Sequence, residues 1–273
     1  MMTNIRDIVN SFTFTSARPF RVFLVALLAL IALSSAPSRA ASGELAATDS
    51  GCAPRQLLTG ATPVGVGPCD GVRPGGFHRT KIGGCTWNFL FRGSDGRKYM
   101  GTAGHCLVSD GEKVWKGGGA PVKGLIDGDE VRVGEAVYGV NDFRRDFGLV
   151  RLDRDVPVSP KMCHFGGPSA GAIDPEIGTL LHHYGNGLIY GDTVPARTSV
   201  AADVLNDPWT VYSVGAALFG DSGSAVITEE GNAVGVLVHL SAAGVGISRL
   251  APHLERAEAK LGIDFKLQTA PLE

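Results

Sequence analysis

Thr102-Ala103-Gly104-His105-Cys106 is the first of three short patterns that decide how this chain is interpreted. The second is Asp146-Phe147-Gly148-Leu149-Val150-Arg151-Leu152, an aspartate at the head of an apolar run, and the third is Gly220-Asp221-Ser222-Gly223-Ser224. A histidine in a glycine-rich turn, an aspartate before a strand and a serine between glycines are each common as purely structural features. Together, in the order His, Asp, Ser and with these neighbours, they indicate a catalytic set.

The chemistry of a serine nucleophile explains why these residue types occur together. A serine hydroxyl needs an adjacent base near neutral pH, so His105 would take the proton of Ser222 and later give it to the leaving group. Asp146 would accept a hydrogen bond from the other imidazole nitrogen, which fixes the tautomer and stabilises the imidazolium. The backbone N–H groups of Gly220 and Ser222 would form the oxyanion hole.

On these motifs the chain resembles the chymotrypsin-like (trypsin-fold) serine proteases, and most of all their secreted bacterial branch, over roughly residues 80–262. The resemblance implies an all-β fold of two antiparallel six-stranded β-barrels with the active site between them. It also implies peptide-bond hydrolysis through an acyl-enzyme, with His105 as base, Asp146 as orienting acid and Ser222 as nucleophile. An α/β-hydrolase is excluded, because its G-x-S-x-G elbow precedes the acid and the histidine in the sequence.

The remaining sequence also favours a β-rich fold. The chain of 273 residues has 38 glycines, about twice the usual share of roughly 7%, which indicates many tight turns. Short apolar segments recur between turn signals, at Thr86–Phe91, Lys98–Thr102, Val131–Val140, Phe147–Leu152, Gly178–Tyr184, Val194–Val200, Trp209–Val214, Ser224–Thr228 and Ala233–Leu240. One C-terminal helix is predicted, with Pro252 near its start and Gly262 at its end.

The N-terminus predicts export. Arg18 and Arg21 precede the apolar run Val22–Leu33, which is shorter than the roughly 20 residues of a membrane-spanning helix. Ser38-Arg39-Ala40 fits a signal-peptidase site. We therefore expect a secreted, extracellular protein that has no membrane attachment after cleavage.

The predicted domain organisation follows from these segments. Residues 153–175 contain four prolines and no clear strand, so they are interpreted as a linker. The expected parts are a signal peptide (1–40), an N-terminal extension or propeptide (41–75) and a protease domain (76–273), the last divided into barrel one (about 76–152), the linker (153–175) and barrel two with the helix (about 176–273).

Charge and composition limit the partners. The chain carries 25 Lys plus Arg against 27 Asp plus Glu, a net charge of −2, so it lacks the basic excess of a nucleic-acid binder. No cofactor and no metal are expected, and the expected partner is a protein or peptide substrate. A monomer is the default expectation, because the sequence carries no interface signal.

The five cysteines are Cys52, Cys69, Cys85, Cys106 and Cys163, and export makes disulfides the default interpretation. The resemblance implies a Cys85–Cys106 bond, since in the family a disulfide ties the strand before the histidine to the residue after it. The other three cysteines remain ambiguous. Cys52–Cys69 is slightly preferred, and the alternative is a bond from one of these two to Cys163.

The specificity of the site is the least determined feature. By family position, Ala216 should lie at the base of the primary pocket, and His239 and Leu240 should lie in its wall. Alanine at position 216 cannot favour Lys or Arg substrates, whereas an aspartate would. A small or medium apolar pocket is expected, with support of an acidic side chain by His239 as an alternative.

Two further questions are left open by the sequence. Asp142 competes with Asp146 for the role of the acid, and Asp146 is preferred because it opens the apolar strand, where the family places that residue. Lys81-Ile82 looks like a tryptic activation site, but Ile82 is too close to Cys85 for a freed N-terminus to reach Asp221. Asp221 then needs another partner, which bacterial relatives often supply as an arginine.

Two other functions are compatible with the same motifs. One is a catalytically silent binding module of the same fold, against which the intact His, Asp and Ser argue. The other is an acyl-ester hydrolase on the same fold, which a panel of peptide and ester substrates would distinguish from an endopeptidase.

Overall fold

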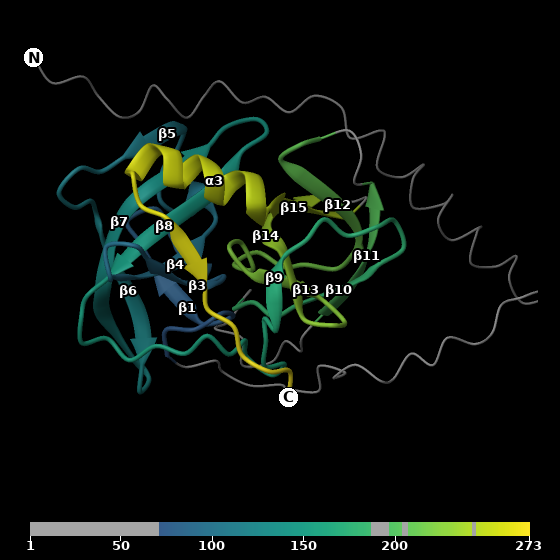
Figure 1. Cartoon of the computed structure of the whole chain (residues 1–273), viewed down its shortest axis with the longest axis horizontal. Coiled ribbons are helices and arrows are strands. Elements are labelled where there is room, and N and C mark those ends of the chain that lie inside the picture. The colour runs from purple at the N-terminus through teal and green to yellow at the C-terminus, as the bar shows by residue number, and fades with distance from the viewer. Residues whose placement is uncertain (1–70, 187–196, 204–206, 242–243) are drawn as a thin grey trace, which may run out of the picture. The chain divides into compact units, whose positions relative to one another are not determined.

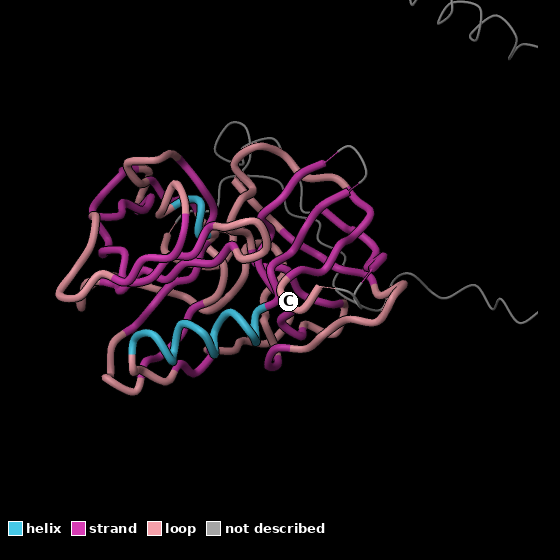
Figure 2. Tube along the Cα trace, turned by 90° about the horizontal axis from the view of Figure 1, so that it is seen from above, coloured by secondary structure: helices cyan, strands magenta, loops and turns pink. Residues whose placement is uncertain are grey.

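Strands dominate the part of the chain that the structure, a computed structural model, describes: residues 71–186, 197–203, 207–241 and 244–273. These residues all lie within one unit of the chain, Pro54–Glu273. The strands form two sheets, and one α-helix lies along them in this part of the chain (Figures 1 and 2). The predicted signal peptide, and all of the predicted extension before residue 71, lie outside the described residues.

The first sheet contains nine strands in the order β16-β3-β4-β8-β7-β6-β1-β2, and β5 pairs with β7 outside this path. Its paired neighbours are antiparallel. The strands are β1 (Phe77–Arg79), β2 (Gly84–Thr86), β3 (Leu90–Gly93), β4 (Lys98–Thr102), β5 (Gly111–Val114), β6 (Pro121–Ile126), β7 (Asp129–Asn141), β8 (Asp146–Leu152) and β16 (Phe265–Leu267).

The second sheet closes on itself. Its six antiparallel strands follow the order β13-β10-β11-β12-β15-β14, and β14 pairs back with β13, while β9 adds a parallel pairing to β14. The strands are β9 (Ala170–Ala172), β10 (Leu180–His183), β11 (Arg197–Asp203), β12 (Thr210–Gly215), β13 (Ala225–Thr228), β14 (Asn232–Ser241) and β15 (Gly244–Arg249). This is the closed six-stranded barrel that the sequence predicts for its second half.

The first sheet curls into an open barrel, since no strand ladder in the described residues joins β2 to the end of the sheet at β3 or β16. The predicted strand Thr86–Phe91 is interrupted, because Trp87 and Asn88 leave the ladder. The N–H of Trp87 donates to the carbonyl of Gly76 and the N–H of Asn88 donates to that of Gly101. The segment predicted as one strand therefore contributes to two strands, β2 and β3.

Three apolar clusters hold this part of the chain together. One fills the first barrel around Trp87 and Met100, and another fills the second barrel around Leu181 and Ile247. The third and largest draws on both barrels and on the helix. Burial of this much apolar surface between the sheets fixes the two barrels against each other, and the candidate site lies at their junction.

The helix α3 (Leu250–Leu261) confirms the predicted C-terminal helix. It ends at Gly262, which adopts the left-handed conformation (φ 68°) and donates its N–H to the carbonyl of Glu258, as expected of a glycine C-cap. Its buried side includes His253, which stacks on Phe147 of β8 and on Trp209. The helix therefore packs directly behind the strand that begins at Asp146.

Two segments differ from the sequence-based interpretation. The predicted linker 153–175 contains the short strand β9, whose Ala-Gly-Ala sequence has no apolar alternation to reveal it. Val72, assigned to the extension, is buried in the first barrel's core and pairs with Val158. Among the described residues, no helix is long and apolar enough to cross a membrane.

Candidate active site

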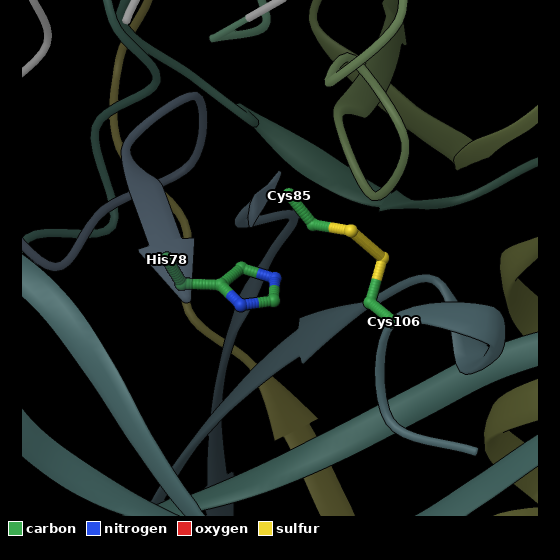
Figure 3. A group of neighbouring side chains, drawn as sticks. All are labelled: His78, Cys85 and Cys106. Atoms are coloured by element: carbon green, nitrogen blue, oxygen red, sulfur yellow. A yellow bond between two sulfur atoms is a disulfide. The ribbon is translucent and has the colours of Figure 1, made fainter. Parts of the chain in front are cut away.

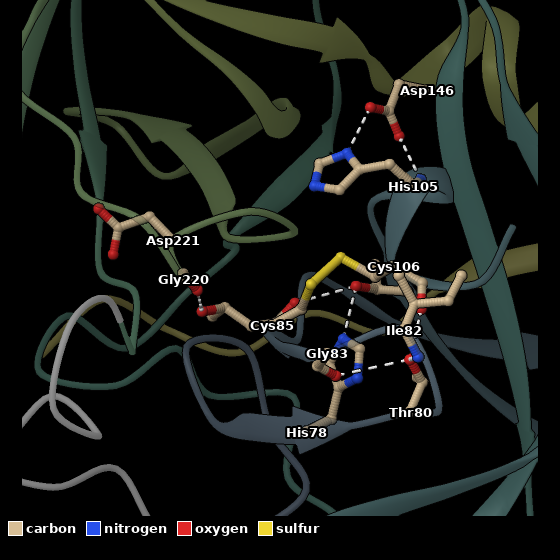
Figure 4. The surroundings of a disulfide bond; sticks show 12 residues. His78, Thr80, Ile82, Gly83, Cys85, His105, Cys106, Asp146, Gly220 and Asp221 are labelled. Carbon is tan, nitrogen blue, oxygen red and sulfur yellow. Dashed lines mark hydrogen bonds and ion pairs between the residues drawn. A yellow bond between two sulfur atoms is a disulfide. The ribbon is translucent and has the colours of Figure 1, made fainter. Parts of the chain in front are cut away.

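His105 and Asp146 lie in direct contact. His105 is in the 3-10 turn Gly104–Cys106 that follows β4, and a Cβ at Gly104 would come within 1.8 Å of the carbonyl oxygen of Val140. Only glycine allows the turn to approach β7 so closely. The N–H of His105 donates to Oδ1 of Asp146 (3.0 Å), and its Nδ1 donates to Oδ2 (2.6 Å) (Figure 4).

This contact determines the electrostatics of the imidazole. Burial lowers the pKa of His105, but the hydrogen bond to Asp146 and the negative charge of that carboxylate together outweigh burial, so the pKa is raised above the usual value. The side chain of Asp146 is 2% exposed and that of His105 is 32% exposed. The ring nitrogen Nε2 points away from Asp146 (Figure 4), so one edge of the ring remains available to another group.

Asp142, the competing carboxylate, is engaged elsewhere. It lies in the turn between β7 and β8 and accepts hydrogen bonds from the backbone N–H groups of Arg144 (3.2 Å) and Arg145 (2.9 Å). It also pairs with the guanidinium of Arg145. Of the two candidate acids, Asp146 is the one that contacts His105.

Ser222, the candidate nucleophile, lies in the connection between β12 and β13, of which residues 218–224 are called the nucleophile loop. A cleft of about 380 Å³ brings Ser222 together with His105 and Asp146. In the described residues, no hydrogen bond joins Oγ of Ser222 to Nε2 of His105. Such bonds are often long or poorly aligned before a substrate binds.

The backbone N–H groups of Gly220 and Ser222, the two candidate oxyanion donors, have no acceptor among the described residues of the protein. Within the part of the chain that is described, neither the N–H of Gly220 nor that of Ser222 donates to a carbonyl or a side chain. The N–H groups between and after them are used, because Asp221 donates to Leu218 and Gly223 donates to Leu237. The loop thus leaves two donors free on either side of Asp221.

The partner of Asp221 is Arg197, the first residue of β11. Its Nη2 lies 2.5 Å from Oδ2 of Asp221, with the two side chains 9% and 0% exposed, and Nε donates to Nε2 of His183 (3.2 Å). Burial, with a smaller contribution from the charge of Arg197, lowers the pKa of His183 to about 3, so this ring is neutral and can accept. The carboxylate of Asp221 also accepts from the N–H of Leu218 (2.7 Å).

The sequence alone could have indicated Arg197 as the partner of Asp221, because Arg197 is the only Lys or Arg between Lys161 and Arg249. Ile82, by contrast, lies in an exposed turn, where its N–H donates to Oγ1 of Thr80 (3.1 Å) (Figure 4). Ile82 precedes β2, which begins only at Gly84.

Of the three predicted pocket residues, the cleft contains two. His239 and Leu240 line it, whereas Ala216 is exposed and is not among the lining residues. Phe219 and Leu240 are 77% and 44% exposed, and both lie at the cleft. The other lining residues are Asn141, Leu218, Leu237 and Val238.

The structure contains the Cys85–Cys106 disulfide that the resemblance implies (Figure 4). It ties β2 to the residue after His105. Cys163, in the connection between the barrels, is also disulfide-bonded, which favours the alternative in which it pairs with Cys52 or Cys69. The preferred Cys52–Cys69 bond falls on residues outside the described part of the chain.

A histidine and two cysteines gather at the first barrel, where His78, Cys85 and Cys106 place their ligand-type atoms within 4.8 Å of one another (Figure 3). The two sulfur atoms are bonded to each other, so they do not act as thiolate ligands. The ring of His78 lies tilted against that of Trp87 at 4.2 Å between ring centroids, and burial lowers the pKa of His78 to about 3. We interpret this group as a structural disulfide beside a neutral buried histidine.

Comparisons with known proteins identify the fold. No protein-family model matches the chain, and no curated relative is found. Among solved structures, Protease A of Thermobifida fusca matches with a TM-score of 0.51 and 17% identity, over 72% of this chain and 99% of that chain. A glutamic-acid-specific serine protease, described as using a histidine triad in substrate binding, matches with a TM-score of 0.51 and 18% identity, over 70% and 98%.

One of these neighbours is described as a protease and the other as a serine protease, and at these identities the likeness concerns the fold. The chain therefore has the chymotrypsin-like fold of bacterial serine proteases. The motifs from which the sequence predicts this fold lie at the junction of the two barrels.

Proposed function

We propose that this protein is a secreted serine endopeptidase that hydrolyses peptide bonds through an acyl-enzyme. The observation that carries the proposal is the contact of Asp146 with His105 in a cleft that Ser222 also lines. Acid, base and nucleophile are the parts that serine acyl transfer requires, and here they come from three distant segments of the chain.

In the proposed mechanism, Ser222 Oγ attacks the scissile carbonyl carbon while Nε2 of His105 takes its proton. The imidazolium gives this proton to the leaving amine as the acyl-enzyme forms, and water then repeats the two steps to release the acid. Asp146 holds Nδ1 of the ring and stabilises the imidazolium. The raised pKa of His105 supports this role, because Asp146 favours the charged ring enough to outweigh burial.

The developing negative charge on the substrate oxygen needs donors in fixed positions. The free N–H groups of Gly220 and Ser222 are suited to this role, and one such donor is worth about 10²–10³ in rate. The ion pair between Arg197 and Asp221 supports the loop that presents them. It would also make a freed N-terminus unnecessary for activity.

For the substrate, we propose an apolar residue before the scissile bond rather than Lys or Arg. The cleft is bordered by Leu218, Phe219 and Leu240. Among its lining residues the one carboxylate, Asp146, is engaged by His105, so a cationic side chain would lose hydration there without a free carboxylate to replace it. An acidic residue is the second candidate, because His239 lines the same cleft and one structural neighbour is glutamate-specific. The ring of His239 lies against the backbone of Gly246.

The remaining parts of the proposal come from the sequence. Residues 1–40 are proposed as a signal peptide and 41–75 as an extension or propeptide before the protease domain 76–273. The mature protein is proposed to act as an extracellular monomer on protein or peptide substrates, without a cofactor.

The test is labelling of the mature protein with a fluorophosphonate, followed by mass mapping of the adduct. The expected result is one adduct on Ser222 that is lost in His105→Ala. Hydrolysis of a peptide panel should be abolished in Ser222→Ala, with the fold intact by circular dichroism. A folded protein that neither labels nor hydrolyses peptides would contradict the proposal and favour a silent binding module, and hydrolysis of esters but not peptides would favour an acyl-ester hydrolase.

A further inference from the structure

We propose that Thr86 is a positioning residue for the oxyanion hole, which it holds in place from the opposite barrel. The inference rests on the proposed function, because it assigns Thr86 a role in orienting the donors of Gly220 and Ser222. Thr86 is the last residue of β2 in the first barrel and is fully buried. The nucleophile loop belongs to the second barrel.

Thr86 makes two hydrogen bonds to this loop. Its hydroxyl donates to the carbonyl of Gly220 (2.8 Å), and its backbone N–H donates to the carbonyl of Ser222 (2.8 Å). The carbonyl between them, that of Asp221, accepts from the N–H (2.8 Å) and the hydroxyl (2.6 Å) of Ser224. All three carbonyls of the segment 220–222 are thus engaged, two of them by Thr86.

The hydroxyl matters most at Gly220. This residue has φ +98°, a conformation that glycine adopts readily because it has no Cβ. The same freedom would let the peptide groups on either side of Gly220 rotate, which would turn its N–H out of the oxyanion hole. The bond to its carbonyl opposes rotation of the peptide group that follows Gly220, and so fixes the Cα from which the N–H of Gly220 is directed (Figure 4).

Other contacts fix the direction of the hydroxyl itself. The N–H of Asn186 donates to Oγ1 of Thr86 (3.0 Å), which leaves the hydroxyl hydrogen for Gly220. The carbonyl of Thr86 accepts from Oγ1 of Thr102 (3.2 Å), and Thr86 pairs with Phe77 across β1 and β2. The hydroxyl therefore donates from a fixed position rather than from a mobile side chain.

The preceding residue gives this strand a second role. Cys85 is bonded to Cys106, which follows His105 in the 3-10 turn. Two consecutive residues of β2 thus anchor the turn of the proposed base and the loop of the proposed oxyanion donors. The barrels supply different parts of the site, and β2 sets the position of one part relative to the other.

The experiment compares Thr86→Val, Thr86→Ser and a control, Thr228→Val. Thr228 is also buried, but its hydroxyl donates to Glu230 within the hairpin between β13 and β14 (2.7 Å). For a peptide substrate, Thr86→Val should lower kcat at least about tenfold with KM within about twofold, because oxyanion donors act mainly in the transition state. The affinity for a peptide boronic acid should fall by the same factor, Thr86→Ser should restore kcat to within about threefold, and the control should match the wild type.

A second readout does not depend on activity. In a Ser222→Ala background, ¹⁵N relaxation and amide exchange of Gly220 should show greater mobility in Thr86→Val than in the parent. Unchanged kcat together with an unchanged Gly220 signal would overturn the proposal, and so would equal impairment by Ser and Val, since packing rather than the hydroxyl would then be responsible.

A wild-type protein that neither labels nor hydrolyses peptides would refute the proposed function alone, while the Gly220 signal would still decide the role of Thr86. If Thr86→Val fails to fold, Thr86→Ala removes the same hydroxyl without placing a methyl group against the Gly220 carbonyl.

Discussion

Replacing Arg197 by methionine tests the support of the nucleophile loop most directly. The substitution keeps much of the apolar stem and removes the charge that lies 2.5 Å from Asp221, whose side chain is fully buried. Removing one partner of a buried ion pair leaves the other charge without its compensation and costs about 3–5 kcal/mol. We expect a loss of this size in the free energy of unfolding.

The same change should reduce activity, because Asp221 lies between the two proposed oxyanion donors. If the loop no longer presents one N–H correctly, kcat should fall by about 10²–10³. Arg197→Met combined with Asp221→Asn should recover part of the stability, because no buried charge then remains. It should recover less of the activity, since the anchor is still missing.

Stability is measured by urea unfolding of the mature chain, with disulfides intact and in a Ser222→Ala background that prevents self-digestion. Arg132→Met is the matched control, because Arg132 pairs with Asp153 (3.2 Å) with both side chains about half exposed. A pair of this kind contributes about 0–1 kcal/mol. If Arg197→Met loses no more than Arg132→Met, the argument that a buried pair holds the loop is refuted.

Three further predictions concern the cleft. Because Asp146 raises the pKa of His105, kcat/KM should rise with pH through a midpoint above the ordinary value of about 6.5, and a flat profile between pH 5 and 8 would speak against His105 as the base. Asp146→Asn should lower kcat by about 10⁴ and move the midpoint of the residual activity downward, whereas Asp142→Asn should keep kcat within about threefold, and the reverse outcome would exchange their roles. Leu240→Gly should raise kcat/KM at least about tenfold for substrates with a large aromatic residue before the scissile bond, and equal gains for alanine substrates would show that Leu240 does not limit pocket size.

The strand pattern was predictable where side chains alternate or cluster and where turn residues mark the ends. Lys98–Thr102 matches β4, and the helix ends at the glycine that the sequence indicated. Short strands without an apolar signature were missed, such as β1 and β9, because their pairing depends on partners distant in the sequence. Local patterns report which residues prefer to be buried, and not which backbone groups lie opposite one another.

The sequence predicted some residues of the candidate site correctly as lining one cleft, but not all of them. His105, Asp146 and Ser222 were identified from their neighbours in the sequence, and the fold brings them to one cleft. Ala216 was assigned to the base of the pocket by family position, yet it is exposed and does not line the cleft. A count from Ser222 along the chain does not show which way the intervening residues face.

The sequence by itself determined the residue types of the proposed chemistry, their order and the β-rich class of the fold. These follow from short motifs and from local patterns of burial and turns, which are properties of neighbouring residues. Only the tertiary structure decided that Arg197 pairs with Asp221 and that Thr86 reaches the loop of Ser222. The Thr86 contact joins residues 134 positions apart, one from each barrel, and such a pair forms only when both barrels have folded and their large shared apolar cluster holds them together.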